Sequence, residues 1–308
     1  MENPENSSKL AEDLSNLLHL TVNEDILLKR MQDYFKPRPA SLVETDDERE
    51  QLEARLSTLS AKLGGPPDVV VTEDEAVLSG RYDTYGMVAI QEALSMFHRS
   101  RRTVCRSHLF FIGSHLVEQH PDWWIPPLKV EEANQTAERL RDCFWDEIEI
   151  AYIRIASFWD RVGQLLDFIF FNIRQYERDG FSTVMDRINV NHVRLYPHLR
   201  SSPAWEHLRS YQVSETTTGL KWLIRRRNLL IHSLHLRALT QSPDDDPIFI
   251  GAYNHIEESV RNKLKPGSTQ DELGYVHSHL ASAANLFHDV IDFCHLALDT
   301  GVVVVSKP

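Results

Sequence analysis

The sequence Arg225-Arg226-Arg227-Asn228-Leu229-Leu230-Ile231-His232 is the most informative stretch of this chain. It places three cations and an imidazole on a segment that predicts a mostly apolar helix. At 3.6 residues per turn, Asn228 and His232 share one face, with His235 three residues further on. Arg227 lies about 140° around the helix from His232. We therefore expect Arg227 either to curl back over the helix or to meet His232 of a second copy of the chain.

The motif belongs to a longer basic segment. Residues 221–237 contain no acid, and their Lys and Arg side chains are Lys221, Arg225, Arg226, Arg227 and Arg237. The 308-residue chain has a formal net charge of -12, which argues against a general nucleic-acid binder, because affinity for phosphates comes mainly from clustered cations. The segment is therefore either a local RNA-contacting patch or a solvated basic face that balances acids elsewhere.

A long apolar helix is predicted before the motif, from about residue 130 to residue 176. Its apolar and aromatic residues recur in steps of three and four, and others, such as Phe158 and Phe168, lie off that stripe. A helix covered on more than one side is central to a bundle or forms part of a dimer seam. Asp160, Gln164 and Asp167 form a polar line along it. That line is either a solvated face or a set of partners for the arginines of the motif.

Helical patterns separated by Pro and Gly occupy most of the remaining chain, so the predicted fold class is all-α. Capping boxes at Thr45–Glu48 and Thr269–Glu272 predict helix starts, and residues 83–99 predict another helix. Residues 68–72 could form a short strand. We expect a boundary in the proline-rich stretch 120–127. This boundary would separate a mostly helical N-terminal region of unassigned role, residues 1–125, from a helical bundle, residues 126–308.

The Arg-Asn-x-x-x-His string at Arg227, Asn228 and His232 resembles the signature of the HEPN family, an all-helical fold best known for metal-independent RNA cleavage. The segment Ala151–Leu166 is similar to the long core helix of the Cthe_2314-type branch of that family. Together the two resemblances cover the C-terminal half to three-fifths of the chain. They imply a HEPN-like bundle preceded by an additional N-terminal region.

The resemblance implies an endoribonuclease that needs no metal and no cofactor. His232 would be the general base that activates the ribose 2′-hydroxyl, and Arg227 would stabilise charge on the phosphorus oxygens. Asn228 would orient His232 or the phosphate, and the products would carry a cyclic phosphate and a 5′-hydroxyl. In the family the site is composite across a two-fold homodimer. We expect Asp160 and His235 in supporting positions and RNA contacts from Lys221, Arg225, Arg226 and Arg237.

Three interpretations remain open for the function. The first is a ribonuclease of toxin–antitoxin, phage-defence or stress-response type; the second is a non-catalytic dimer that binds RNA or a protein partner. The third is a purely structural helical protein. Many HEPN toxins carry a tyrosine two residues after the histidine, where this chain has Leu234. Silencing by adenylylation of that tyrosine is therefore not expected. Either a different antitoxin or regulatory protein would control the enzyme, or the chain would be a stand-alone defence or stress protein.

Other classes of site lack support in the sequence. Gly-rich phosphate loops, CxxC pairs, Gly-x-Ser-x-Gly and His-Glu-x-x-His are absent, and His288, Asp292 and His295 at helical spacing form only a weak metal candidate. The three cysteines show no paired spacing. No apolar run suits a membrane span and no signal peptide is recognised. We expect a cytoplasmic protein with no membrane partner.

Overall fold

The computed structural model describes residues 38–64, 69–71, 76–78, 85–123, 127–174, 180–232, 236 and 265–302. The chain divides into two compact units, Met1–Pro39 and Ala40–Pro308, and nearly all described residues belong to the second. Its elements are α2 (Asp46–Lys62), β1 (Val69–Val71), β2 (Ala76–Leu78), α3 (Tyr85–Gln119), η2 (Pro121–Trp123), α4 (Val130–Phe171), α5 (Phe181–Ile188), η3 (Asn189–Val193), α6 (Pro197–Arg200), α7 (Pro203–Val213), α8 (Leu220–His232) and α12 (Thr269–Asp299). The predicted all-α fold is confirmed. The sequence also predicts helices at residues 10–20 and 24–35, and these lie outside the described residues.

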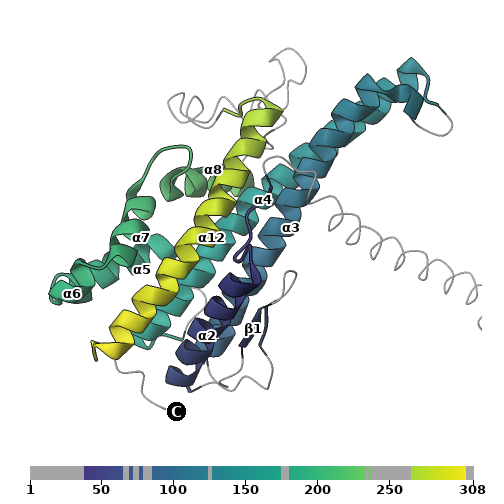
Figure 1. Ribbon diagram of the computed structural model, residues 1–308. Coiled ribbons are helices and arrows are strands. Elements are labelled where there is room, and N and C mark those ends of the chain that lie inside the picture. Colours follow the sequence, from purple (N-terminus) through teal and green to yellow (C-terminus); the bar gives the residue numbers. More distant parts are fainter. Residues whose placement is uncertain are drawn as a thin grey trace, which may run out of the picture. The chain divides into compact units, whose positions relative to one another are not determined.

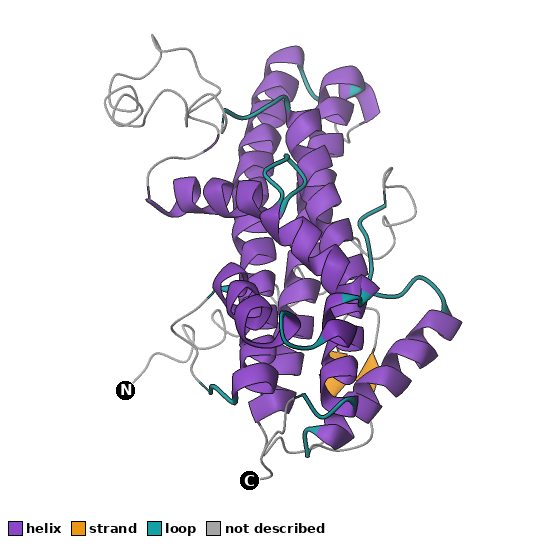
Figure 2. Cartoon of the chain, turned by 90° about the vertical axis from the view of Figure 1, so that its left-hand side faces the viewer, coloured by secondary structure: helices purple, strands orange, loops and turns teal. Residues whose placement is uncertain are grey.

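Helix α4 is the centre of the second unit. It packs against α3, α5, α8 and α12, so it is covered on several sides, as its apolar pattern predicted. Helix α12 lies along α4 and also contacts α2, α3 and α7 (Figure 1). Figure 2 shows the helices from the side, with the two short strands in orange. The fully buried rings of Tyr152, Trp159 and Phe287 lie in the shared core. Helix α4 ends at Phe171, earlier than the end near residue 176 that the sequence predicted, and its C-cap residue Asn172 has a positive φ of 52°.

Helix α3 is longer than the sequence predicted. The helix predicted over residues 83–99 begins at Tyr85 and continues to Gln119. Arg101 is buried rather than solvated, and Arg154 of α4 donates a hydrogen bond to Arg99 O at 3.3 Å. Contacts with α4 therefore accompany the continuation of α3 beyond residue 99.

The domain boundary expected near residue 125 does not coincide with the division in the structure. Residues 120–129 connect α3 to α4, and these two helices pack against each other within one unit. Their far ends form an arm with a small core of its own, Val117, Ala133 and Ala137 (Figure 1). The short helix η2 within the proline-rich stretch thus lies at the tip of a helical hairpin. The division of the chain lies at residues 39–40 instead.

Local signals placed several element ends correctly. Thr45 caps α2, its Oγ1 accepting a hydrogen bond from Glu48 N at 3.2 Å. The predicted strand near residue 70 is β1, which pairs antiparallel with β2 through Val70 and Val77. The second capping box is shifted by one residue, because Ser268 and not Thr269 is the N-cap of α12. Within the described residues, no helix is both long enough and apolar enough to cross a membrane.

Candidate functional site

Helix α8, which carries the motif, has two faces of different character. It packs against α4 and α7. Trp222, Arg226 and Leu229 are buried, and their spacing of four and three residues places them on the face toward the core. A second face, about 100° around the helix from the first, carries Lys221, Arg225 and Asn228, all exposed. Arg225 is thus exposed, Arg226 is buried and Arg227 is partly exposed, so the three consecutive arginines lie in three different environments.

Arg226 is not on the RNA-facing surface that the sequence predicted. Its side chain is 1% exposed, and Nη2 lies 2.7 Å from Oε1 of Glu272, which is 0% exposed. The guanidinium lies over the ring of Trp222, 4.7 Å from the centroid, and near the ring of Tyr152. The expectation that Arg226 binds RNA is therefore wrong. Its charge is used inside the bundle, where it joins α8 to α12.

The Arg226–Glu272 pair belongs to a buried polar cluster. Tyr152 of α4 donates from its hydroxyl to Glu272 Oε2 at 2.6 Å, and Gly267 N donates to Glu272 Oε1 at 2.9 Å. Burial raises the pKa of Tyr152 well above its usual value, so the phenol stays protonated and donates. Because the carboxylate has three donors around it, the charge pair satisfies the condition under which buried ions are retained.

Arg227 and Asn228 lie at a partly exposed position beside α4. Arg227 Nη1 donates to Asn228 Oδ1 at 3.3 Å, and Nη2 lies 3.9 Å from Asp160 Oδ2. The Arg227 side chain is 32% exposed. Burial raises the pKa of Asp160, and the charges of Arg227 and Arg161 oppose that rise. The sequence paired Asp160 with Arg227 or Arg226; the structure brings it to Arg227.

The end of the motif is described only in part. His232 is the last residue of α8, one turn beyond Asn228. Its side chain, together with His235 and Arg237, lies outside the described residues. Just beyond, the backbone N–H of Leu236 donates to the Glu149 carboxylate of α4. This end of α8 is therefore next to the central helix.

Lys221 and Arg225, both expected to contact RNA, share one carboxylate. Lys221 Nζ lies 3.2 Å from Glu215 Oε1, and Arg225 Nη1 lies 3.4 Å from Glu215 Oε2. Hydrogen bonds from these two cations lower the pKa of Glu215. The basic segment itself contains no acid, and its neutralising partner comes from the loop just before it.

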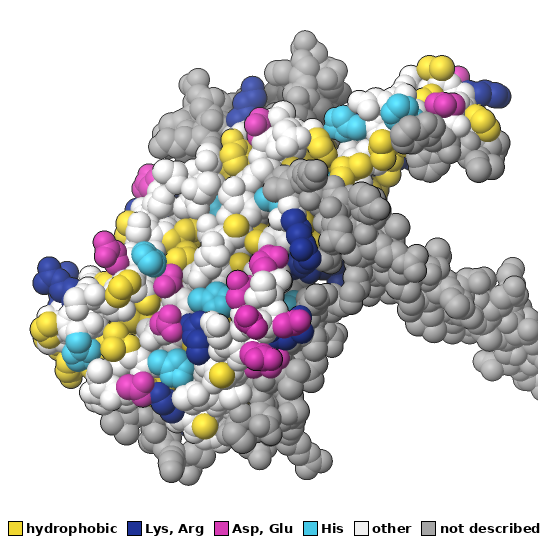
Figure 3. Space-filling view, in the orientation of Figure 1, with side chains coloured by type: hydrophobic (Ala, Val, Ile, Leu, Met, Phe, Trp, Pro, Cys, Tyr) yellow, Lys and Arg dark blue, Asp and Glu magenta, His cyan; other side chains and the backbone are white. Residues whose placement is uncertain are grey.

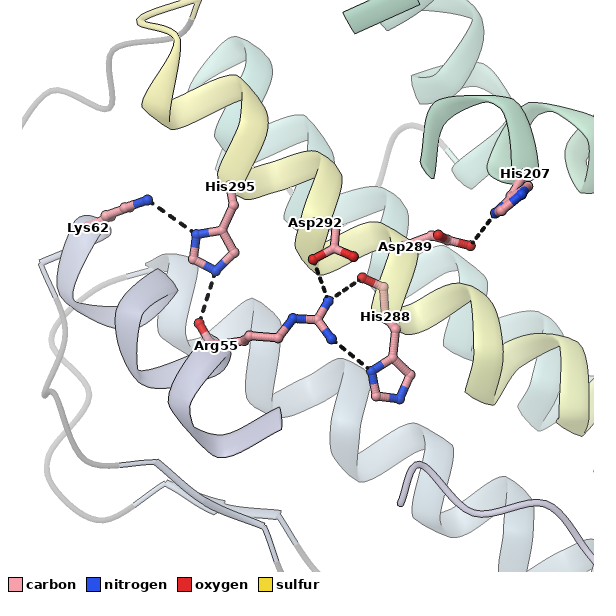
Figure 4. Close-up of polar contacts among 7 residues, drawn as sticks. All are labelled: Arg55, Lys62, His207, His288, Asp289, Asp292 and His295. Atoms are coloured by element: carbon pink, nitrogen blue, oxygen red, sulfur yellow. Dashed lines mark hydrogen bonds and ion pairs between the residues drawn. The ribbon is translucent and has the colours of Figure 1, made fainter. Parts of the chain in front are cut away.

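His288, Asp292 and His295 do share a face of α12, but that face contacts α2 (Figure 4). His288 Nε2 donates to Leu42 O at 2.9 Å, and its Nδ1 accepts from Arg55 at 3.0 Å. His295 uses both nitrogens in the same way, toward Arg55 O and Lys62 Nζ. Figure 3 shows such histidine, acidic and basic side chains gathered over α12 and α2. Within the described part of the chain, no three His, Cys, Asp or Glu side chains form a metal-binding group.

Sequence reasoning missed the residues that complete the site. Glu272 was assigned to a capping box, and Glu215 lay outside the basic segment. Arg226 lies four residues after Trp222 and three before Leu229, so it shares their face of the helix. That spacing was the available signal in the sequence, because an arginine on a buried face needs an acid beside it. No family model, curated protein or solved structure matches the chain significantly.

Proposed function

We propose that this protein is a metal-independent endoribonuclease of HEPN type, with Arg227, Asn228 and His232 in its active site. The observation that carries the proposal is the contact between Arg227 and Asn228 at a partly exposed position on α8, next to Asp160. Arg226, the adjacent residue, is buried and anchors the helix. Arg227 and Asn228 are thus accessible to solvent on a helix that Arg226 anchors, where a substrate phosphate can reach them.

The chemistry follows from the residue types. A neutral imidazole at position 232 takes the proton from a ribose 2′-hydroxyl, and the oxygen then attacks the adjacent phosphorus. The 5′-oxygen leaves and takes a proton from solvent, and the imidazolium returns its proton to solvent, so that the products carry a cyclic phosphate and a 5′-hydroxyl. Arg227 stabilises the charge on the non-bridging oxygens, because its planar guanidinium donates two parallel hydrogen bonds. Asp160 keeps that guanidinium oriented, and Asn228 orients the imidazole or the phosphate.

A homodimer is part of the proposal. Arg227 and position 232 lie about 140° apart around α8. A two-fold axis that brings two α8 helices together lets Arg227 of one copy meet His232 of the other. The proposed setting is the cytoplasm, in a toxin–antitoxin, phage-defence or stress response. An antitoxin or another regulatory protein would then restrain the enzyme.

The test compares wild type with His232→Ala on mixed RNA in excess EDTA, after circular dichroism and thermal unfolding show that both fold alike. We expect cleavage by wild type, with cyclic phosphate ends, and a loss of about 100-fold or more in the variant. His198→Ala, a change at an exposed histidine of α6, is the matched control and should retain full activity.

Asp160→Asn should reduce the rate of RNA cleavage by about tenfold, because Arg227 loses the charge that orients it.

Cleavage that persists in His232→Ala would contradict the proposed mechanism. If neither protein cleaves RNA, the alternative gains support, namely a non-catalytic HEPN-like dimer that binds RNA or a protein partner. A structural role for His232 predicts a third result, in which His232→Ala lowers the melting temperature and no activity is lost.

A further inference from the structure

The exposed face of α8 continues from the motif back toward the start of the helix. Lys221, Arg225 and Asn228 follow each other at spacings of four and three residues, and position 232 comes four residues later. These positions therefore form one line along the helix, on which the three described side chains are exposed. The rise of a helix places Lys221 and Arg225 about 10 Å and about 4.5 Å from Asn228 along the axis. Two cations thus lie within two turns of the proposed catalytic residues.

A carboxylate already bridges these two cations. Glu215 lies in the loop between α7 and α8, with one oxygen 3.2 Å from Lys221 Nζ and the other 3.4 Å from Arg225 Nη1. Carboxylate and phosphate oxygens accept the same charge-assisted hydrogen bonds from Lys and Arg. The position of the Glu215 carboxylate therefore marks where a phosphate would be held between the same two side chains.

The Glu215 contact contributes little to holding the loop in place. The side chains of Lys221 and Arg225 are each 45% exposed and that of Glu215 is 54% exposed, and ion pairs of this kind add little stability in water. The loop is held by its own backbone, since Gly219 N donates to Thr216 O at 2.8 Å and Lys221 N donates to Ser214 O at 3.2 Å. Glu215 can therefore leave the two cations without unfolding the loop.

We propose that Lys221 and Arg225 form a phosphate subsite for single-stranded RNA, and that Glu215 occupies this subsite until RNA displaces it. The identity of the polyanion as RNA rests on the proposed function. A single strand is the form that fits, because in-line attack of a 2′-hydroxyl on its neighbouring phosphate needs a backbone free to rotate. The strand lies along α8, with its reacting phosphate at Arg227 and Asn228 and a flanking phosphate at Lys221 and Arg225. Glu215 opposes binding, so ligands with few phosphates compete poorly.

The experiment measures fluorescence anisotropy of a short, labelled, single-stranded 2′-O-methyl RNA bound to the full chain in EDTA, at low and at physiological ionic strength. The probe lacks the attacking hydroxyl, so binding is read without cleavage. We expect Glu215→Gln to bind about three- to fivefold more tightly than wild type at low ionic strength. Lys221→Ala and Arg225→Ala should each bind about three- to tenfold more weakly, with a salt slope reduced by about 1. Glu206→Gln, which removes the same charge from an exposed position on α7, is the matched control and should leave affinity within about twofold.

A double-mutant cycle separates the subsite from a general charge effect. In the Lys221→Ala/Arg225→Ala background, Glu215→Gln should no longer change the affinity for RNA, because the two cations with which Glu215 pairs are absent. The proposal is overturned if Glu215→Gln does not tighten binding in the wild-type background. It is also overturned if the gain is equal in the double-alanine background or equal to that of Glu206→Gln. Failure of the cleavage test alone would refute the ribonuclease while leaving this binding pattern intact, so the two proposals can be distinguished.

Discussion

Arg226 and Glu272 form a buried charge pair between α8 and α12. Their guanidinium and carboxylate are 1% and 0% exposed, so neither group has bulk water as an alternative partner. Glu272→Ala leaves the guanidinium without its counter-charge, and we expect the free energy of unfolding to fall by about 3–5 kcal/mol. Urea denaturation followed by circular dichroism measures this loss.

The double variant Arg226→Met/Glu272→Leu supplies the control for that prediction. It removes both charges together and should be less destabilised than Glu272→Ala, because no buried charge is left uncompensated. If Glu272→Ala unfolds at the same urea concentration as wild type, an uncompensated charge at Arg226 does not destabilise the protein, and the prediction is contradicted.

Buried imidazoles give the protein a predictable response to acid. Burial lowers the pKa of His108, of His277 and of His279 to about 4. In an unfolded chain the pKa of histidine is about 6.5, so between pH 6.5 and pH 4 the unfolded chain binds protons that the folded chain does not bind. Their contribution to stability is therefore fully present above about pH 6.5 and is lost as the pH falls toward 4. We expect a loss of about 1 kcal/mol per imidazole between about pH 7.5 and about pH 5.5, measured by urea denaturation.

The imidazole pair between α3 and α12 allows a direct check. His277 Nε2 lies 3.2 Å from His108 Nδ1, and both rings are buried. His277→Gln keeps a hydrogen-bonding group but does not titrate, so stability should fall less steeply with acid than in wild type. An unchanged slope in the variant would contradict the assignment of the acid sensitivity to this pair.

Two glycines test how closely the helices approach. A Cβ at Gly163 of α4 would lie 2.9 Å from the backbone N and Cα of Phe181, where α5 begins, whereas a Cβ at Gly274 of α12 meets nothing within 4 Å. We expect Gly163→Ala to destabilise the protein by about 2 kcal/mol, because backbone atoms must move. Gly274→Ala should stabilise it by about 0.5–1 kcal/mol through helix propensity. Differential scanning calorimetry measures both, and equal shifts in melting temperature would refute the close approach of α4 and α5.

Across the whole molecule, the division at residues 39–40 predicts which truncation is tolerated. A chain of residues 40–308 retains every described helix and should keep a cooperative unfolding transition close to that of the full chain. A chain of residues 126–308 lacks α2 and α3, which uncovers the apolar faces of α4 and α12, and should aggregate or bind a hydrophobic dye. Size-exclusion chromatography and thermal unfolding distinguish the two truncated chains, and stable folding of residues 126–308 would restore the boundary expected from sequence.

The sequence by itself determined what depends on neighbours within a turn or two. The all-α class, the cap at Thr45, the long central helix and the separation of Arg227 from position 232 around α8 all follow from local spacing. These features were predicted correctly for the described residues because helix geometry is periodic. The resemblance to HEPN proteins and the role of His232 stay predictions.

Only the tertiary structure decided which cations are buried and which helices belong together. Arg226 meets Glu272, which is 46 positions further along the chain, and Tyr152 meets the same carboxylate across 120 positions. Helical phase places Arg226 on one face with Trp222 and Leu229, but it could not show that this face is buried or that Glu272 is the acid that meets it. The length of α3 was likewise set by its packing on α4. Burial and charge pairing depend on residues distant in sequence, and only folding brings those residues together.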